Sequence, residues 1–129
     1  MLKKTITYTD YNDVERTEDF YFNLSEAELM EMELTVDGGM VEKLQRIIKS
    51  KNGPEIVKFF KEMVLKAYGV KSDDGRRFIK SDELSQAFSQ TEAYSQLYME
   101  FATNDKAAAE FVNGIMPKKV QEKAKAAQI

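Results

Sequence analysis

The carboxylates in the second half of the chain come nearest to a metal site by residue type. Residues 73–83 contain four of them around Gly75, a composition typical of calcium-binding loops. The spacing does not fit. With Gly75 at the sixth position of such a loop, Val70 and Ser81 fall at the first and twelfth positions, which require an aspartate and a bidentate glutamate. We therefore interpret residues 71–80 as a surface turn.

Other reactive groups are scarce. The chain contains no histidine and no cysteine, which are the usual general base near neutral pH and the usual zinc ligands. Ser-His and Cys-His triads, disulfides and zinc sites are excluded, so an enzyme would have to use carboxylates, Lys, Tyr or a bound cofactor. The pair Gly38-Gly39 lacks a preceding buried strand and a lysine-bearing phosphate loop, and we interpret it as a helix boundary. We predict no catalytic residue, no cofactor, no metal and no enzymatic activity.

The charge distribution argues against nucleic acid as a partner. The 129 residues carry a net charge of −3, but residues 1–37 hold ten acids against three bases. From Pro117 onward the chain has four Lys and one Glu, so removing this tail's +3 leaves −6 on the body. Binding to a phosphate backbone depends on clustered Lys and Arg, which an acidic body does not supply. No apolar run approaches the roughly 20 residues of a membrane span, and we expect a cytosolic protein.

The N-terminal segment alternates as strands do. Ile6 and Tyr8 are predicted on one face of a first strand, and Val14, Phe20 and Phe22 on one face of a second. Residues 10–13 are the turn between them. This pattern predicts a β-hairpin over residues 3–22 with one aromatic face. Because an isolated hairpin is only marginally stable, that face must pack on helices, and the hairpin edge is also available to a partner.

A complete helix start follows the hairpin. Ser25 is the expected N-cap and Glu28 closes a capping box, while Leu24 and Leu29 have the spacing of a hydrophobic staple. The helix that they predict continues to about Leu34.

Two further helices are predicted before residue 70. Apolar residues recur at helical spacing over residues 40–52. Asn52 then caps a third helix, which ends at Gly69-Val70 in the manner of a Schellman motif. Its apolar residues cover about half of the helix circumference, so we expect this helix to be central.

Three short helices complete the predicted domain. The first is capped by Ser81, and the second opens with a capping box over Ser89-Gln90-Thr91-Glu92. The third is capped by Thr103 or Asn104 and closes at Gly114-Ile115.

The predicted fold class is mainly α (α+β), an N-terminal β-hairpin packed on a compact bundle of about five or six short helices. We expect one globular domain over residues 1–116, with its helical part at 25–116. The Lys-, Gln- and Ala-rich residues 117–129 cannot bury enough apolar surface to order themselves, which predicts a basic tail that is frayed or disordered.

The chain is also rich in residues that suit adaptable contacts. It has six Tyr, eight Phe and seven Met. The N-terminal aromatics lie among acids, which favours core or protein-interface packing over base stacking. Flexible thioethers suit either core filling or surfaces that bind and self-associate.

Several segments together resemble the tail assembly chaperones of long-tailed bacteriophages and prophages of Gram-positive bacteria. The likeness covers nearly the whole chain up to Pro117. The segments are Thr5-Ile6-Thr7-Tyr8-Thr9-Asp10-Tyr11-Asn12, Phe20-Tyr21-Phe22-Asn23-Leu24-Ser25, Tyr68-Gly69 with Asp74-Gly75-Arg76-Arg77-Phe78-Ile79-Lys80-Ser81, Phe88-Ser89-Gln90-Thr91-Glu92-Ala93-Tyr94 and Phe111-Val112-Asn113-Gly114-Ile115.

The resemblance implies a helper in tail morphogenesis that is absent from the finished virion. Members of the family commonly occur in two lengths through a programmed ribosomal frameshift. The shared portion is thought to coat the tape measure protein, and the extension to recruit the major tail protein of the tube. The resemblance implies that this chain is the short form, and that it self-associates.

The resemblance carries over no contact residue. We hypothesise that the aromatic hairpin face with Tyr8, Phe20 and Phe22, or Met30 and Met32 beside it, contributes to self-association or to tape measure binding. The alternative function is a small acidic regulator that binds and inhibits one host or phage protein. Stoichiometry separates the two, since a coat needs many copies and a decoy one or two.

Overall fold

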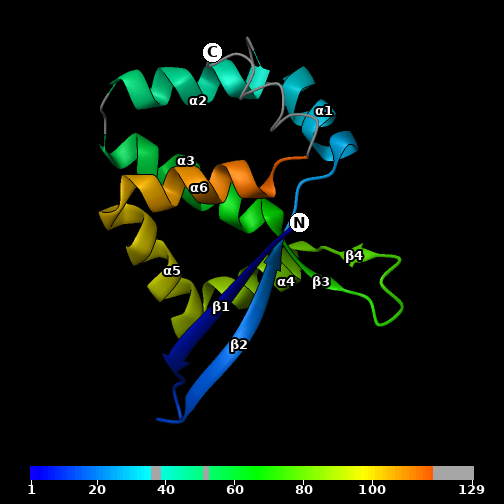
Figure 1. Ribbon diagram of the computed structural model, residues 1–129, viewed down its shortest axis with the longest axis vertical. Helices are drawn as coiled ribbons and strands as arrows, with labels where there is room; N and C mark the ends of the chain where they lie inside the picture. The colour runs from blue at the N-terminus through cyan, green and yellow to red at the C-terminus, as the bar shows by residue number, and fades with distance from the viewer. Residues whose placement is uncertain (36–38, 51–52, 118–129) are drawn as a thin grey trace.

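A computed structural model describes residues 1–35, 39–50 and 53–117 of the chain (Figure 1). These residues form a four-stranded antiparallel sheet and six helices, which confirms the predicted α+β class with its N-terminal hairpin. The elements are β1 (Leu2–Thr9), β2 (Glu15–Phe22), α1 (Glu26–Thr35), α2 (Gly39–Ser50), α3 (Gly53–Ala67), β3 (Tyr68–Lys71), β4 (Phe78–Ile79), α4 (Asp82–Ser89), α5 (Glu92–Thr103) and α6 (Asp105–Ile115).

The β1–β2 hairpin turns where the sequence predicts. The backbone N–H of Asp13 donates to the carbonyl of Asp10 at 3.0 Å, and Asp13 adopts φ 61°, the arrangement of a type I turn followed by a left-handed residue. The Asp10 carboxylate accepts bonds from the N–H groups of Asn12 and Val14. Ile6 and Tyr8 are buried as expected, but Val14 lies in the turn and is 51% exposed. The predicted aromatic face therefore does not include Val14.

A second hairpin replaces the predicted loop. The expected helix end at Gly69-Val70 is wrong, because α3 stops at Ala67 and the next residues form β3. Strand β3 pairs with the end of β2 through Tyr21 opposite Gly69, and β4 pairs with β3, giving the order β1-β2-β3-β4. Backbone pairing of Tyr68 and Gly69 with the end of β2 thus outweighs the local signal for a helix stop.

Glycine at position 69 is required by packing. A Cβ atom built there would lie 2.7 Å from Cε2 of Phe78 and 2.8 Å from the carbonyl oxygen of Ile79. The Phe78 ring therefore occupies the place of a side chain and holds β4 against β3.

Three predicted helix starts are confirmed. The capping box is complete, because the Ser25 N–H donates to Glu28 at 3.0 Å and the Glu28 N–H donates to the Ser25 hydroxyl at 3.1 Å. Ser81 caps α4, and of the two candidates for α6 it is Asn104 that serves, accepting from the Ala107 N–H. The predicted Asn52 cap lies outside the described residues, as do positions 118–129 of the predicted tail.

One helix start is wrong and one helix end is confirmed. Ser89 does not open α5, because it is the last residue of α4, and Thr91 is the N-cap instead, accepting from the Tyr94 N–H at 3.1 Å. Helix α6 ends at Ile115, within the predicted close at Gly114-Ile115. The Leu2 side chain comes within 3.1 Å of the position that a Gly114 Cβ would take, so this glycine lets β1 approach the helix.

The segment Asn23–Leu24, hereafter the crossover segment, joins the sheet to two helix ends. The Asn23 N–H donates to the carbonyl of Ala67 at the end of α3 (2.8 Å), and the Leu24 N–H donates to the carbonyl of Ile115 at the end of α6 (2.9 Å). The Asn23 carbonyl in turn accepts from the ammonium group of Lys80 at 2.6 Å. Terminal helix carbonyls lack partners within their own helix, so these donors satisfy groups that burial would otherwise leave unpaired.

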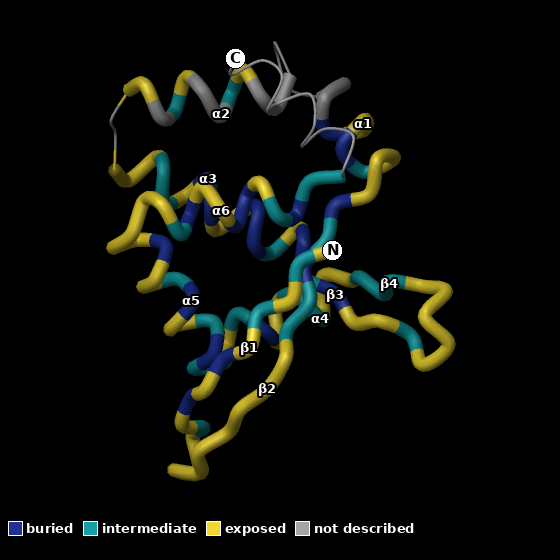
Figure 2. Tube along the Cα trace, in the orientation of Figure 1, coloured by how far each residue is buried: buried dark blue, intermediate teal, exposed yellow. Residues whose placement is uncertain are grey.

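The core forms where the sheet meets the helices. Figure 2 shows buried positions on the facing sides of α3, α5 and α6 and at the end of the hairpin nearest to them, whereas most of β2 is exposed. The predicted central role of α3 is confirmed, since it packs against α2, α4, α5 and α6. The largest fully buried side chains are Phe22, Leu24, Met63, Leu97 and Ile115.

We predict that Gly69→Ala lowers the free energy of unfolding by about 2 kcal/mol or more, because a methyl group there meets a ring and a backbone carbonyl. Gly53→Ala is the control, since nothing lies within 4 Å of its added Cβ, and we expect a change within about 0.5 kcal/mol. Urea denaturation of the three proteins measures both effects. Equal stability of the two variants would contradict the packing of Phe78 on Gly69.

The second prediction concerns the ion pair between Lys80 and Glu28, whose Nζ and Oε2 atoms lie 2.6 Å apart. Burial raises the pKa of Glu28, but hydrogen bonds from Lys80 and from the Ser25 amide outweigh it, and the pKa lies below 4.5. The stability that Glu28 contributes is therefore present above about pH 4.5 and is lost as the pH falls through the lowered pKa.

Glu28→Gln keeps an oxygen for the Ser25 amide but removes the titration. We expect it to be less stable than wild type by up to about 1 kcal/mol near pH 7, since Glu28 is partly solvated, with the difference vanishing toward about pH 3. Glu31→Gln, exposed on the same helix, is the control. A difference that stays constant across this pH range would show that the charge of Glu28 contributes nothing.

Candidate protein-interaction surfaces

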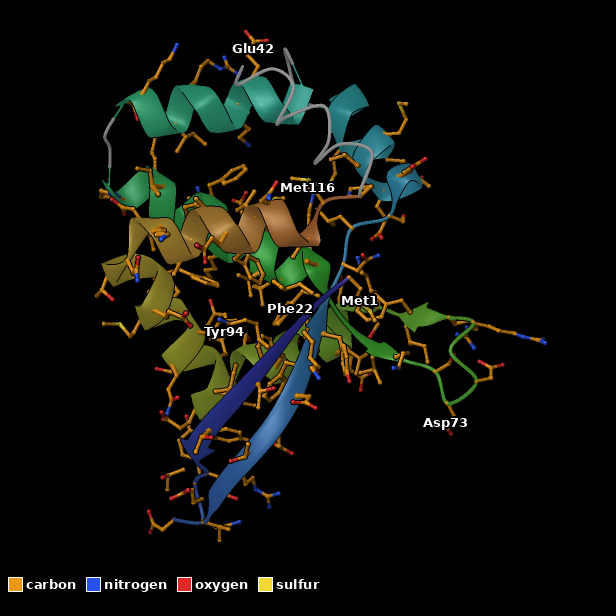
Figure 3. All side chains as sticks on the ribbon, in the orientation of Figure 1. Met1, Phe22, Glu42, Asp73, Tyr94 and Met116 are labelled. Carbon is orange, nitrogen blue, oxygen red and sulfur yellow. The ribbon has the colours of Figure 1, made fainter. Side chains whose placement is uncertain are left out.

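The acidic stretch around Gly75 is the turn of the β3–β4 hairpin. The Asp74 carboxylate accepts bonds from the Arg76 N–H and from the Ser72 hydroxyl, which together lower its pKa. Gly75 takes φ 73°, which glycine adopts without strain. Asp73 projects from the tip of this turn (Figure 3). The predicted surface turn is therefore present, but it is shorter than residues 71–80, because Lys71 and Phe78–Ile79 belong to strands.

The described residues contain no group of three or more Asp or Glu side chains placed to hold a metal ion, and none of their polar or charged residues is buried. Among these same residues, no helix combines the length and the apolar character that crossing a membrane requires.

The five residues predicted to contact partners lie in different environments. Tyr8, Phe22 and Met32 are buried, with exposed fractions of 8%, 0% and 9%, and Phe20 is half-buried. Met30 is 61% exposed on α1. Of the five, Met30 thus offers the most surface in the folded chain, and whether any of them contacts a partner stays a prediction.

The aromatic hairpin face packs against helices of the same chain. The Phe20 ring lies 5.2 Å from that of Phe88 in α4, and the Phe22 ring lies 5.2 Å from that of Phe111 in α6. Tyr68 stacks on Phe88 at 4.3 Å with an angle of 11° between the rings. Aromatic contacts therefore join the sheet to α4 and α6.

The tip of the β1–β2 hairpin exposes Tyr11, which was not predicted as a contact residue, and Val14, which was predicted on the aromatic face. Tyr11 is 75% exposed and Val14 is 51% exposed. The tip is acidic, and the guanidinium of Arg16 bonds the Asp10 carboxylate at 2.6 Å and holds its pKa below the usual value. The signal that could have identified Tyr11 is its position inside the predicted turn, where a large side chain has no core to enter.

A shallow apolar groove lies between α3 and α5. Its walls include Phe60 and Val64 of α3 and Tyr94 and Tyr98 of α5. The Tyr94 hydroxyl is buried and has no hydrogen-bond partner among the described residues, and burial raises its pKa. Tyr94 projects from α5 toward the interior in Figure 3. A buried hydroxyl without a partner carries a desolvation cost.

This cost yields a prediction. Tyr94→Phe removes the unpaired hydroxyl and should raise the free energy of unfolding by about 1 kcal/mol. Tyr8→Phe is the matched variant, because the Tyr8 hydroxyl donates to the Glu18 carboxylate, and its loss should lower stability by about 1 kcal/mol. Thermal and urea unfolding report both. A loss of stability in Tyr94→Phe would indicate that its hydroxyl is hydrogen-bonded after all.

The fold and these surfaces define a class, a small α+β protein whose described part presents apolar side chains and gathers no metal-ligand cluster. The chain belongs, more particularly, to a family of phage tail assembly chaperones, whose model matches residues 1–128. A search of curated proteins and a search of solved structures each found no match.

Proposed function

We propose that this protein binds the tape measure protein during tail assembly in the bacterial cytoplasm and is absent from the finished virion. The observation that carries the proposal is the family match over residues 1–128. In this proposal the chain catalyses nothing, because shielding a long amphipathic rod requires apolar contact and no reaction. It acts as the short form, in several self-associated copies. The major tail protein is recruited by a longer frameshift product.

Met30 is our choice for the contact with the tape measure protein. It was among the predicted contact residues and is the one with most of its side chain in solvent, at 61% exposed. Thioether side chains adapt to irregular apolar partners. Tyr8, Phe22 and Met32 are buried and would contact a partner only after local opening.

Co-expression with the tape measure protein tests the proposal. We expect the tape measure protein to become soluble and to bind many copies of this chain, measured by pull-down and mass photometry. A complex with one or two copies of this chain would instead indicate an acidic regulator, and an insoluble tape measure protein would contradict the chaperone role.

The contact itself gives a variant prediction. Met30→Glu should weaken binding to the tape measure protein by about tenfold, equivalent to about 1.4 kcal/mol, because it places a charge in an apolar contact. Met99→Glu is the matched control, since Met99 is 54% exposed on α5, and should bind as wild type does. Both variants should keep their stability within about 0.5 kcal/mol. Equal binding by the two variants would show that Met30 does not contact the tape measure protein.

A further inference from the structure

The outer edge of the sheet has a defined set of free backbone groups. In an antiparallel pair, opposed residues alternate between those that bond each other and those whose N–H and C=O groups point away. The Asp10 N–H donates to the Val14 carbonyl at 2.9 Å, and with the register of β1 and β2 this alternation makes Tyr8 with Arg16 and Ile6 with Glu18 bonded pairs. The intervening residues of β1 therefore point their backbone N–H and C=O groups away from β2. They are Lys3, Thr5, Thr7 and Thr9.

These outward groups have no strand beside them. Strand β1 is at the end of the sheet order β1-β2-β3-β4, and none of the backbone bonds outside the regular ladders in the described part of the chain reaches it. Lys3, Thr5, Thr7 and Thr9 are all exposed. An edge of eight residues without a bulge or a proline is a template for another strand.

Helix α5 forms a wall along this edge. It packs against β1 (Figure 1), and a groove between the two is lined by Thr5, Ile6 and Thr7 on one side and by Gln96, Leu97 and Glu100 on the other. The ammonium group of Lys4 bonds Glu100 at 3.2 Å and joins β1 to α5 beside the groove. Leu97 is only 1% exposed and belongs to the core beneath.

We propose that an extended segment of a partner polypeptide binds in this groove as a fifth strand, paired with β1 at Thr5 and Thr7. Only an extended backbone offers donors and acceptors that repeat every two residues, about 6.6 Å, as the outward groups do. The groove floor is apolar at Leu97, its rims are uncharged at the two threonines and Gln96, and the paired charges of Lys4 and Glu100 also line it. The segment that fits has a small aliphatic side chain facing α5 and polar β-branched side chains on the threonine face.

Two other occupants fit less well. A second copy could pair its β1 with this β1 about a twofold axis normal to the sheet. Its α5 would then lie on the same face and at the same edge as this α5, and the two helices would compete for the same space. The basic residues 118–129 are mostly Lys, Ala and Gln, which are poor strand formers. The proposal does not depend on which tail protein supplies the segment, so it stands or falls separately from tape measure binding.

A proline substitution tests the pairing with a matched control in the same hairpin. Thr7 and Thr17 oppose each other, and their hydroxyl groups bond at 2.9 Å. Thr7→Pro removes an outward N–H beside α5 and leaves the β1–β2 ladder intact. Thr17→Pro removes the equivalent N–H on the far edge of β2, beyond the two residues that pair with β3. Both variants lose the hydrogen bond between the Thr7 and Thr17 hydroxyl groups. They therefore differ only in which edge of the hairpin loses its outward N–H.

The probe is a library of synthetic peptides of eight residues, the length of β1, screened against the full chain. We expect peptides that bind wild type and Thr17→Pro alike, bind Thr7→Pro about tenfold more weakly, and slow hydrogen exchange at the Thr5 and Thr7 amides. N-methylation of alternate peptide amides should abolish binding to wild type, a test that holds even if Thr7→Pro fails to fold.

Four outcomes overturn the proposal. They are the absence of any binding peptide, equal weakening in both proline variants, a wild-type dimer that Thr7→Pro dissociates, and amide protection in free wild type that disappears when residues 118–129 are deleted. The third would make a second copy the occupant, and the fourth the chain's own tail.

Discussion

Two backbone hydrogen bonds from the crossover segment hold the architecture together. Asn23 and Leu24 leave the end of β2 and donate to the last carbonyls of α3 and α6, so the sheet and two helices that are far apart in sequence share one junction. Phe22 and Leu24 beside these bonds are almost fully buried. Breaking these two hydrogen bonds would leave buried carbonyls unpaired. It would also expose the apolar side chains beside them, so both losses would occur together. Lys80, which bonds both Asn23 and Glu28, ties the second hairpin and α1 to the same point.

This junction also decides which surfaces remain for partners. Because the sheet must present its aromatic face to α4 and α6, the rings that made the hairpin conspicuous in the sequence are mostly used in folding. The exposed surfaces of the described residues include the apolar side chain of Met30, the acidic hairpin tip with Tyr11, and the unpaired edge of β1. A phage tail assembly chaperone with these features can offer side-chain contacts and backbone pairing on separate parts of its surface.

Two local signals were reliable because one short segment contains both partners of the interaction. The Asp10–Asp13 turn and the Ser25/Glu28 capping box each close within a few residues, so the sequence is sufficient to predict them. The box predicted to begin at Ser89 failed, because Thr91 caps α5. The helix stop predicted at Gly69 failed because its neighbours pair with the end of β2, some 47 positions earlier, and form a strand. The approach of Leu2 to Gly114 from the other end of the chain likewise depends on tertiary packing.

Composition and the periodicity of short segments are sufficient to predict the α+β class, the N-terminal hairpin, the central helix and the lack of histidine and cysteine chemistry. Which apolar side chains are exposed depends instead on how the folded segments pack. Met30 and Met32 are two positions apart on one helix, yet one is exposed and the other buried. Tyr8 and Tyr11 are three apart, and only the first enters the core. Exposure depends on what packs opposite each side chain, and that is set by contacts between segments far apart in the chain.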